Sequence, residues 1–261
     1  MTLQPTTPQQ QTLINLLFSL RYITRVQFQQ YLGNYDPSNT NRHLKYLIDK
    51  RYMKRVGEGS EEEKGSSKPA TYCIGRNGIR LIAQLRGLKV DDLKNRYKDG
   101  RHSEAFIDHH MLLTTIFLQF REGAGEKDTK LTFQTKSDFE KDSYLARFSP
   151  DAYIVEETED KKKISLLEII DIEAQRFVLK RRIRSVIKLF LSNSLEVETG
   201  ENFPTILFIC PTKELQGFMK NYIKKIQENQ GEDIIFKFTT YEKVKKSGVN
   251  SKIWKGVQET K

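Results

Sequence analysis

The chain has 261 residues, of which 37% are hydrophobic, and its formal net charge is +10 at pH 7. It contains no apolar run near twenty residues, and its first residues lack a basic segment followed by an apolar one. We therefore expect neither a transmembrane span nor a secretory signal. The two cysteines, Cys73 and Cys210, lie far apart in strand-like runs, which indicates buried free thiols in a reducing compartment rather than a disulfide or a zinc pair.

The positive charge is concentrated near the N-terminus. Residues 1–100 contain 17 Lys and Arg against 9 Asp and Glu, a balance of +8, whereas the remaining residues contain 27 against 25, a balance of +2. A basic excess of this kind indicates a polyanionic partner for the N-terminal part, which we interpret as nucleic acid.

The N-terminal part predicts three helices followed by two strands. Leucines three and four residues apart predict a first helix over 9–20. Thr24 and Gln27 have the spacing of a capping box, which starts a second helix at Arg25. Ser38 or Asn39 would cap a third helix that runs to about residue 50. Short strands at 52–56 and 71–74, with a polar loop between them, complete the pattern of a winged helix-turn-helix.

The third helix carries side chains suited to the major groove of DNA. Arginine can pair with guanine, asparagine can pair with adenine, and lysine can contact phosphates. Basic residues of the wing would touch the DNA backbone, although the acidic run at 61–63 opposes such a contact. The alternative is a solvated helix face on a small helical domain. The predicted DNA-binding residues are Asn39, Thr40, Asn41, Arg42, His43, Lys45, Tyr46, Lys54, Arg55 and Lys68.

The order of elements predicts two domains. We expect a winged-helix domain over 1–86, a charged and weakly periodic linker over 87–100, and a second domain over 101–261. The second domain begins with a long helix that carries His109 on its apolar stripe, either as an interfacial histidine or as a contributor to an acidic site. Strands and helices then alternate, which predicts an α/β fold with a mixed sheet flanked by helices. Its helix at 175–191 has a basic face that either follows phosphates or is simply solvated.

Acidic residues occur in two consecutive strands of the second domain. Asp151 opens an apolar strand, and a second strand predicted at 164–172 contains Glu168 and Asp171. A carboxylate within an apolar strand is costly unless it binds a cation or accepts hydrogen bonds. Two such strands followed by a helix resemble the core of PD-(D/E)XK nucleases, in which carboxylates hold Mg²⁺ or Mn²⁺.

The second acidic position of that core is ambiguous. A lysine commonly lies two residues after the second acid, but Ile170 has this position relative to Glu168, and Glu173 has it relative to Asp171. A period of two would place Asp171 and Glu173 on one face of the strand. We therefore predict Asp151, Asp171 and Glu173 as the catalytic and metal-binding residues of any active site, with Mg²⁺ or Mn²⁺ as the metal.

A winged helix, a histidine-containing helix, Pro150-Asp151-Ala152, an acid-x-acid segment and a terminal Ile253-Trp254 follow one another along the chain. In this order the chain resembles the replication-relaxation family of plasmid and mobile-element proteins. The resemblance implies a protein of the bacterial cytoplasm that binds double-stranded DNA without a cofactor and assists replication or transfer. The resemblance does not settle catalysis, and the incomplete acidic motif leads us to expect a degenerate nuclease-like domain. We name replication or relaxase proteins as further partners and a homodimer as the assembly. An active metal-dependent endonuclease or nickase and a dimeric transcriptional autoregulator are the alternatives.

Overall fold

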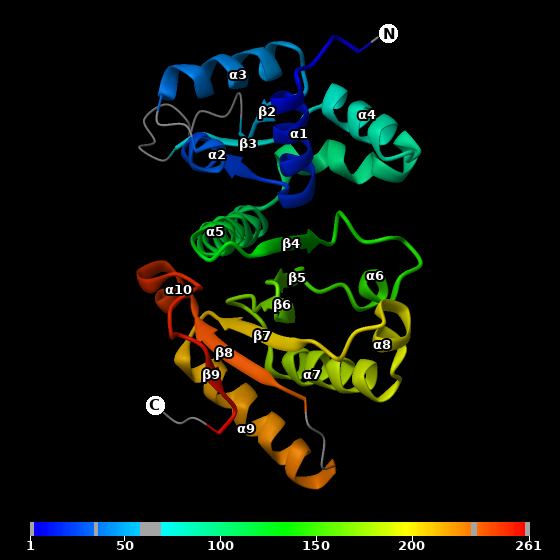
Figure 1. Cartoon of the computed structure of the whole chain (residues 1–261), viewed down its shortest axis with the longest axis vertical. Coiled ribbons are helices and arrows are strands. Elements are labelled where there is room, and N and C mark those ends of the chain that lie inside the picture. Colours follow the sequence, from blue (N-terminus) through cyan, green and yellow to red (C-terminus); the bar gives the residue numbers. More distant parts are fainter. Residues whose placement is uncertain (1–2, 34–35, 58–68, 231–233, 259–261) are drawn as a thin grey trace. The chain divides into compact units, whose positions relative to one another are not determined.

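The computed structural model describes residues 3–33, 36–57, 69–230 and 234–258 (Figure 1). Contacts within the chain divide it into two compact units, Met1–Leu118 and Gln119–Lys261. This division falls later than the predicted domain boundary at 87–100. Among the described residues, no helix is both long enough and apolar enough to cross a membrane.

The described part of unit 1 has the predicted helices and strands in the expected order, with one further short strand, Ile23–Thr24, between the first two helices. Its three strands form an antiparallel sheet of order β1-β3-β2. Large apolar side chains are fully buried, among them Phe18 and Phe28 of the first two helices and Tyr52, which directly precedes the second strand. The elements are α1 (Pro8–Leu20), β1 (Ile23–Thr24), α2 (Arg25–Leu32), α3 (Pro37–Asp49), β2 (Met53–Arg55), β3 (Thr71–Ile74), α4 (Arg76–Leu85) and the 3-10 segment η2 (Val90–Arg101).

Local capping fixes where the helices of unit 1 begin. The predicted capping box of α2 is present, because Thr24 accepts from the Gln27 amide while the Gln27 side chain accepts from the Thr24 amide. The expected cap of α3 was wrong: the cap is Asp36, whose carboxylate accepts from the Ser38 amide at 2.8 Å. Pro37 then occupies the first turn, where a missing N–H has no cost. The tip between β2 and β3 lies outside the described residues.

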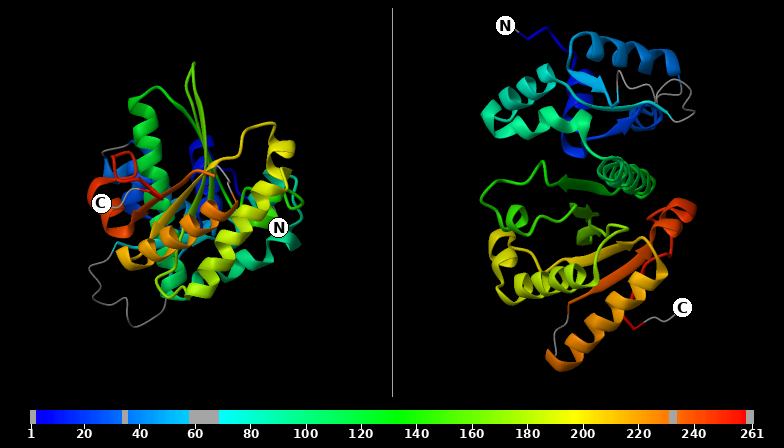
Figure 2. Two further views of the ribbon diagram at one scale, coloured as in Figure 1. Left: turned by 90° about the horizontal axis from the view of Figure 1, so that it is seen from below. Right: turned by 180° about the vertical axis from the view of Figure 1, so that it is seen from behind.

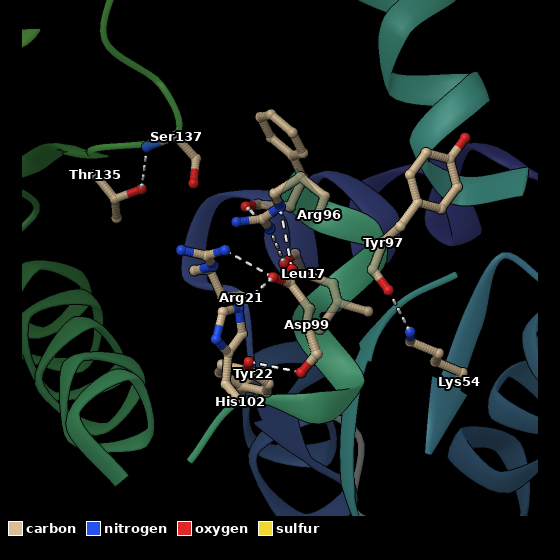
Figure 3. Close-up of polar contacts among 11 residues, drawn as sticks. Leu17, Arg21, Tyr22, Lys54, Arg96, Tyr97, Asp99, His102, Thr135 and Ser137 are labelled. Atoms are coloured by element: carbon tan, nitrogen blue, oxygen red, sulfur yellow. Dashed lines mark hydrogen bonds and ion pairs between the residues drawn. The ribbon is translucent and has the colours of Figure 1, made fainter. Parts of the chain in front are cut away.

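The segment expected to be a linker packs against the rest of unit 1. Arg96 donates to the Phe18 carbonyl at 2.6 Å, and Lys54 donates to the Tyr97 carbonyl at 3.1 Å (Figure 3). Asp99 is fully buried. These contacts are made by polar groups, which is why apolar periodicity gave no sign of them.

Unit 2 contains a six-stranded mixed sheet of order β4-β5-β6-β7-β8-β9. Pairing is parallel from β6 to β8 and antiparallel elsewhere, which confirms the expected α/β class. Helix α5 (Glu104–Glu126) contributes only its residues from 119 onward to this unit. The other elements are β4 (Lys130–Thr135), α6 (Tyr144–Phe148), β5 (Ala152–Glu157), β6 (Lys162–Ile169), α7 (Arg176–Leu191), α8 (Ser194–Thr199), β7 (Thr205–Cys210), α9 (Lys213–Gln230), β8 (Phe236–Thr240), α10 (Tyr241–Ser247) and β9 (Lys255–Gly256).

Helices α7 and α9 lie on the same face of the sheet (Figures 1 and 2). Their apolar side chains, such as Ile183 and Ile223, form one buried cluster with the facing residues of the strands. Phe208 and Phe238 stack within it, with ring centroids 5.3 Å apart. Strand β7 is buried along almost its whole length, as its continuous apolar sequence predicts.

Strand β6 ends earlier than the sequence predicts. Its last residue is Ile169, and the chain then turns, with the Glu173 amide donating to the Asp171 side chain at 3.1 Å. Asp171 and Glu173 are therefore not strand residues, and the alternation used to place them on one face does not apply. Both cysteines are buried free thiols, and burial raises the pKa of each to about 12.

Candidate nucleic-acid interface and acidic site

The outward face of α3 combines amide and cationic side chains. Asn41, Arg42 and Lys45 are exposed, and Arg42 donates to the half-buried Asn39 side chain at 2.9 Å. Residues three and four apart on a helix share a face, so these groups form one continuous polar surface. Such a set can donate to phosphates and to the base edges of the major groove.

Two other predicted contact residues of α3 face the interior of unit 1. Thr40 has 1% of its surface exposed and His43 has 8%. Burial, together with the neighbouring Arg42 charge, lowers the pKa of His43 and so favours its neutral form. Tyr46 is half-buried and donates to the Pro5 carbonyl. The outward surface of α3 is therefore smaller than the sequence predicts, because Thr40 and His43 do not belong to it.

The predicted wing residues differ in their exposure. Arg55 is exposed at the end of β2. Lys54 is half-buried and uses its ammonium group to hold the Tyr97 carbonyl. Lys68 lies outside the described residues. The predicted DNA-binding residues that are exposed are therefore Asn41, Arg42 and Lys45 of α3 and Arg55 of β2.

In unit 2, the strand register places two acids and one lysine in a row. Thr135 pairs with Ala152, and Ala152 pairs with Leu167, so the next positions across the three strands are Lys136, Asp151 and Glu168. We call these three residues the acid row. Asp151 and Glu168 are both buried, with 5% and 6% of their surfaces exposed. Two carboxylates therefore lie beside each other, one directly before β5 and one within β6.

Each carboxylate of the acid row is bonded to a cation of the same unit. Lys136 donates to one oxygen of Asp151 at 3.0 Å, and the Ile169 amide donates to the other at 2.7 Å. Arg182, from α7, approaches Glu168 with both Nε, at 2.9 Å, and Nη2. This two-point contact is the strongest geometry for an arginine and a carboxylate.

Arg182 is itself held from several sides. Its Nη1 donates to the Phe148 carbonyl at 2.6 Å and its Nη2 to the Ser149 carbonyl at 3.2 Å. Its guanidinium carbon lies 3.9 Å from the centre of the Phe148 ring. The guanidinium thus binds one carboxylate and two carbonyl oxygens, all of which are the hard oxygen donors that a divalent ion would otherwise prefer.

The electrostatics of the acid row reflect burial first and the neighbouring like charge second. Burial raises the pKa of Glu168 to about 7, and the neighbouring Asp151 adds to this effect, while Arg182 opposes it. Burial also raises the pKa of Tyr241, with smaller contributions from Asp171 and Asp151. The Tyr241 hydroxyl donates to the Ile170 carbonyl, which anchors the turn after β6.

Asp171 and Glu173, the other two predicted ligands, are exposed in the turn before α7. Within the described part of the chain, no group of three or more His, Cys, Asp or Glu side chains is arranged to hold a metal ion. The structure thus does not gather Asp151, Asp171 and Glu173 into a ligand set. Glu168 lies beside Asp151 instead, and Arg182 binds its carboxylate, so these residues do not fit a metal.

Sequence reasoning missed two of the residues at this site. Lys136 precedes the acidic strands and was not considered, although its position one residue after β4 could have been aligned with Asp151. Arg182 appeared only as one cation among several in the basic helix. His109, the other candidate, lies in unit 1 with its ring 5.4 Å from the His110 ring.

Comparisons with known proteins give one family and one solved structure. The sequence model of the replication-relaxation family matches residues 14–184, which is more than half of the chain. The structure of restriction endonuclease FokI aligns with 92% of this chain and 43% of its own, at 10% identity and a TM-score of 0.33. The chain thus spans less than half the length of that structure. No curated protein matches the chain.

Proposed function

Because the chain belongs to the replication-relaxation family, we propose that it is a double-stranded DNA-binding accessory protein of plasmid or mobile-element replication or transfer. The observation that carries this proposal is the exposed face of α3, where Asn41, Arg42 and Lys45 lie together in a unit with a strong basic excess. Lys45 would contact the DNA backbone, while Arg42 and Asn41 would bind base edges.

The test is duplex binding measured by fluorescence anisotropy. Arg42→Ala should weaken binding to the cognate site by about 1–3 kcal/mol, because a lost bidentate contact to guanine has this magnitude. Arg76→Ala is the matched control, since it removes an exposed arginine from α4 of the same unit. Equal affinities of the two variants would remove α3 from the interface.

We further propose that the nuclease-like domain is degenerate. The two-point contact of Arg182 with Glu168 supports this, because a guanidinium already neutralises one acid and would have to leave before a metal ion entered. Under this proposal, purified protein does not nick or cut supercoiled plasmid with Mg²⁺ or Mn²⁺. Asp151→Ala would leave affinity for DNA unchanged.

An active endonuclease is the second candidate, and the acid row is the observation that favours it. Lys136 supplies a lysine beside Asp151 and Glu168, although it comes from a neighbouring strand. Cleavage of plasmid that requires Mn²⁺ and is lost in Asp151→Ala would establish this candidate and overturn degeneracy. Cleavage that survives Asp151→Ala would indicate a contaminating nuclease.

The assembly and the cellular setting belong to the same proposal. We place the protein in the bacterial cytoplasm, where it would act on DNA with replication or relaxase proteins and as a homodimer. Light scattering on the purified protein gives its mass and tests the dimer. Footprinting of the region upstream of its own gene tests the autoregulator, which requires a palindromic site there.

A further inference from the structure

Helices α7 and α9 of unit 2 carry a dense positive charge. Helix α7 has six Lys and Arg residues and no acidic residue, while α9 has four Lys and two Glu residues. Both helices pack on the same face of the sheet, with their apolar sides turned to the core (Figure 2). The cations other than Arg182, which is bound to the buried Glu168, therefore share the outer surface of this helix pair, which we call the α7–α9 surface.

Four cations of α7 lie on one line along the helix. Arg176, Lys180, Arg184 and Lys188 are spaced four residues apart, so each is about 6 Å along the axis from the next and the line is about 18 Å long. Like charges at this spacing destabilise a helix. The arrangement therefore has a stability cost that requires a compensating role.

Aromatic side chains of α9 lie beneath this line. The Arg176 guanidinium carbon is 5.2 Å from the centre of the Phe218 ring, and the Lys180 ammonium is 5.4 Å from that of Tyr222. The Arg184 side chain donates to the Tyr222 hydroxyl at 2.8 Å. These contacts hold the cations in position before any ligand arrives, which lowers the entropy cost of binding.

Elsewhere in unit 2, three lysines of the sheet strands are paired with glutamates. The lysines on the edge and hairpin strands form ion pairs with Glu201, Glu156 and Glu157. On the α7–α9 surface, by contrast, the structure describes only the exposed pair of Arg176 with Glu214 and that of Lys224 with Glu228. Over the described residues, no carboxylate forms an ion pair with Arg181, Arg184 or Lys188, so these charges remain available.

We propose that the α7–α9 surface binds the phosphodiester backbone of duplex DNA as a second contact, separate from α3. This inference takes DNA as the partner from the proposed function. The rings of Phe218 and Tyr222 are half-buried under the cations, so they offer no platform for base stacking and the contact has no sequence preference. A membrane surface fits less well, because most apolar residues of α7 are buried in the core of unit 2, and the exposed Phe177 and Leu191 lie near its two ends.

The test compares two triple variants that remove equal charge. One combines Lys180→Gln, Arg184→Gln and Lys188→Gln on α7. Its control combines Lys245→Gln, Lys246→Gln and Lys252→Gln, three exposed lysines in or near α10. Affinity of the full chain for a random-sequence duplex is measured by anisotropy at several salt concentrations. The α7 variant should lower the slope of log affinity against log salt by about 2–3, since each lost phosphate contact accounts for about 0.9.

A second variant tests whether the change in slope comes from lost charge or from a disturbed fold. Arg181→Gln with Lys188→Gln removes two cations that lie over no aromatic ring in the described structure, and it should lower the slope by about 1–2. Salt slopes of the α7 variants equal to that of the control would overturn the proposal. So would binding to phosphatidylserine vesicles that is lost in the α7 triple variant while its DNA binding is unchanged.

The two DNA-binding proposals fail separately. Arg42→Ala without effect, together with a reduced slope in the α7 variant, would refute recognition by α3 and support the α7–α9 surface. The opposite result would refute the α7–α9 surface and support α3.

Discussion

The two units each bury carboxylates, but they neutralise them differently. In unit 1, Asp99 is fully buried and pairs with Arg21 at 2.7 Å and with Arg96 at 3.2 Å, while His102 lies 3.7 Å away (Figure 3). We call these four residues the Asp99 cluster. In unit 2, the acid row holds two neighbouring carboxylates, and each has one cationic partner.

The difference teaches how to separate a structural acid from a candidate functional one. A single acid between two guanidinium groups has its charge neutralised, and the Asp99 cluster holds η2 against α1 and the chain that follows it. Burial raises the pKa of Glu168, and the second acid beside it adds to this effect. Perturbed carboxylates that lie side by side are typical of functional sites, whereas burial alone is not.

The largest effect should come from the Asp99 cluster. Asp99→Ala leaves Arg96 buried without its acid, and burial already lowers the pKa of this arginine to about 10. Removing one partner of a buried pair costs about 3–5 kcal/mol. Urea unfolding followed by circular dichroism should therefore show a loss of this size.

The control for that experiment is Asp91→Ala, in the same segment. The Asp91 side chain is 78% exposed and pairs with Lys94 at 3.1 Å. Exposed pairs of this kind contribute about 0–1 kcal/mol. Comparable losses in the two variants would show that the Asp99 cluster is not what fastens this segment.

Removal of Arg182 should be the next largest effect. Arg182→Leu leaves the buried Glu168 without its cationic partner. It should lower the free energy of unfolding by about 2–4 kcal/mol, less than a fully buried pair would, because the arginine is partly exposed. The double variant Arg182→Leu with Glu168→Leu should recover most of this loss, because a buried ion pair can be replaced by apolar groups. Trp254 is the single tryptophan and lies in unit 2, so its fluorescence during urea unfolding follows this transition.

The neighbouring Arg181 provides the control, because its side chain is exposed. Arg181→Leu should leave the unfolding transition nearly unchanged. A double variant no more stable than Arg182→Leu would mean that Arg182 acts through its contacts with the Phe148 and Ser149 carbonyls rather than through Glu168.

The raised pKa of Glu168 predicts a pH dependence of stability. The folded protein keeps the Glu168 proton up to about pH 7, whereas the unfolded chain releases it near 4.5. Between these values the folded state binds more protons, so stability falls as the pH rises. From pH 5 to pH 8 the wild type should lose about 1–3 kcal/mol more than Glu168→Gln, which lacks this titration. Parallel pH curves for the two proteins would contradict the assignment.

The two clusters also differ in how far the sequence could predict them. The α/β class, the continuous strand β7 and the caps of α2 follow from local patterns, and the structure agrees with them. Asp151 could be identified because Pro150 and an apolar run mark where its strand begins. Asp99 could not be identified from the sequence, because its segment has no apolar periodicity and its partner Arg21 is 78 residues away.

The second acid shows why the rest could not be predicted. The choice between Glu168 and Asp171 depended on where β6 ends, and the end of a strand depends on its neighbours. Here the Ile170 amide donates to the Ile209 carbonyl of β7, and the chain then turns. The strand ends three residues earlier than predicted. For this reason the sequence favoured the exposed Asp171 and Glu173 over the buried Glu168. Thr40 and His43 illustrate the same point, because the rotation of α3 that buries them is set by packing.

The smallest effect should come from Lys136. Its side chain is 48% exposed, and Asp151 retains the hydrogen bond from the Ile169 amide when the lysine is replaced. Lys136→Met should therefore cost only about 0.5 kcal/mol, as expected for a half-exposed pair. The same substitution should further raise the pKa of Glu168, because Lys136 is among the charges that lower it. The pH at which Lys136→Met loses stability would then shift upward relative to the wild type. A loss above about 2 kcal/mol would instead mean that Lys136 compensates both acids, which would make the acid row resemble the Asp99 cluster and remove the distinction between the two units.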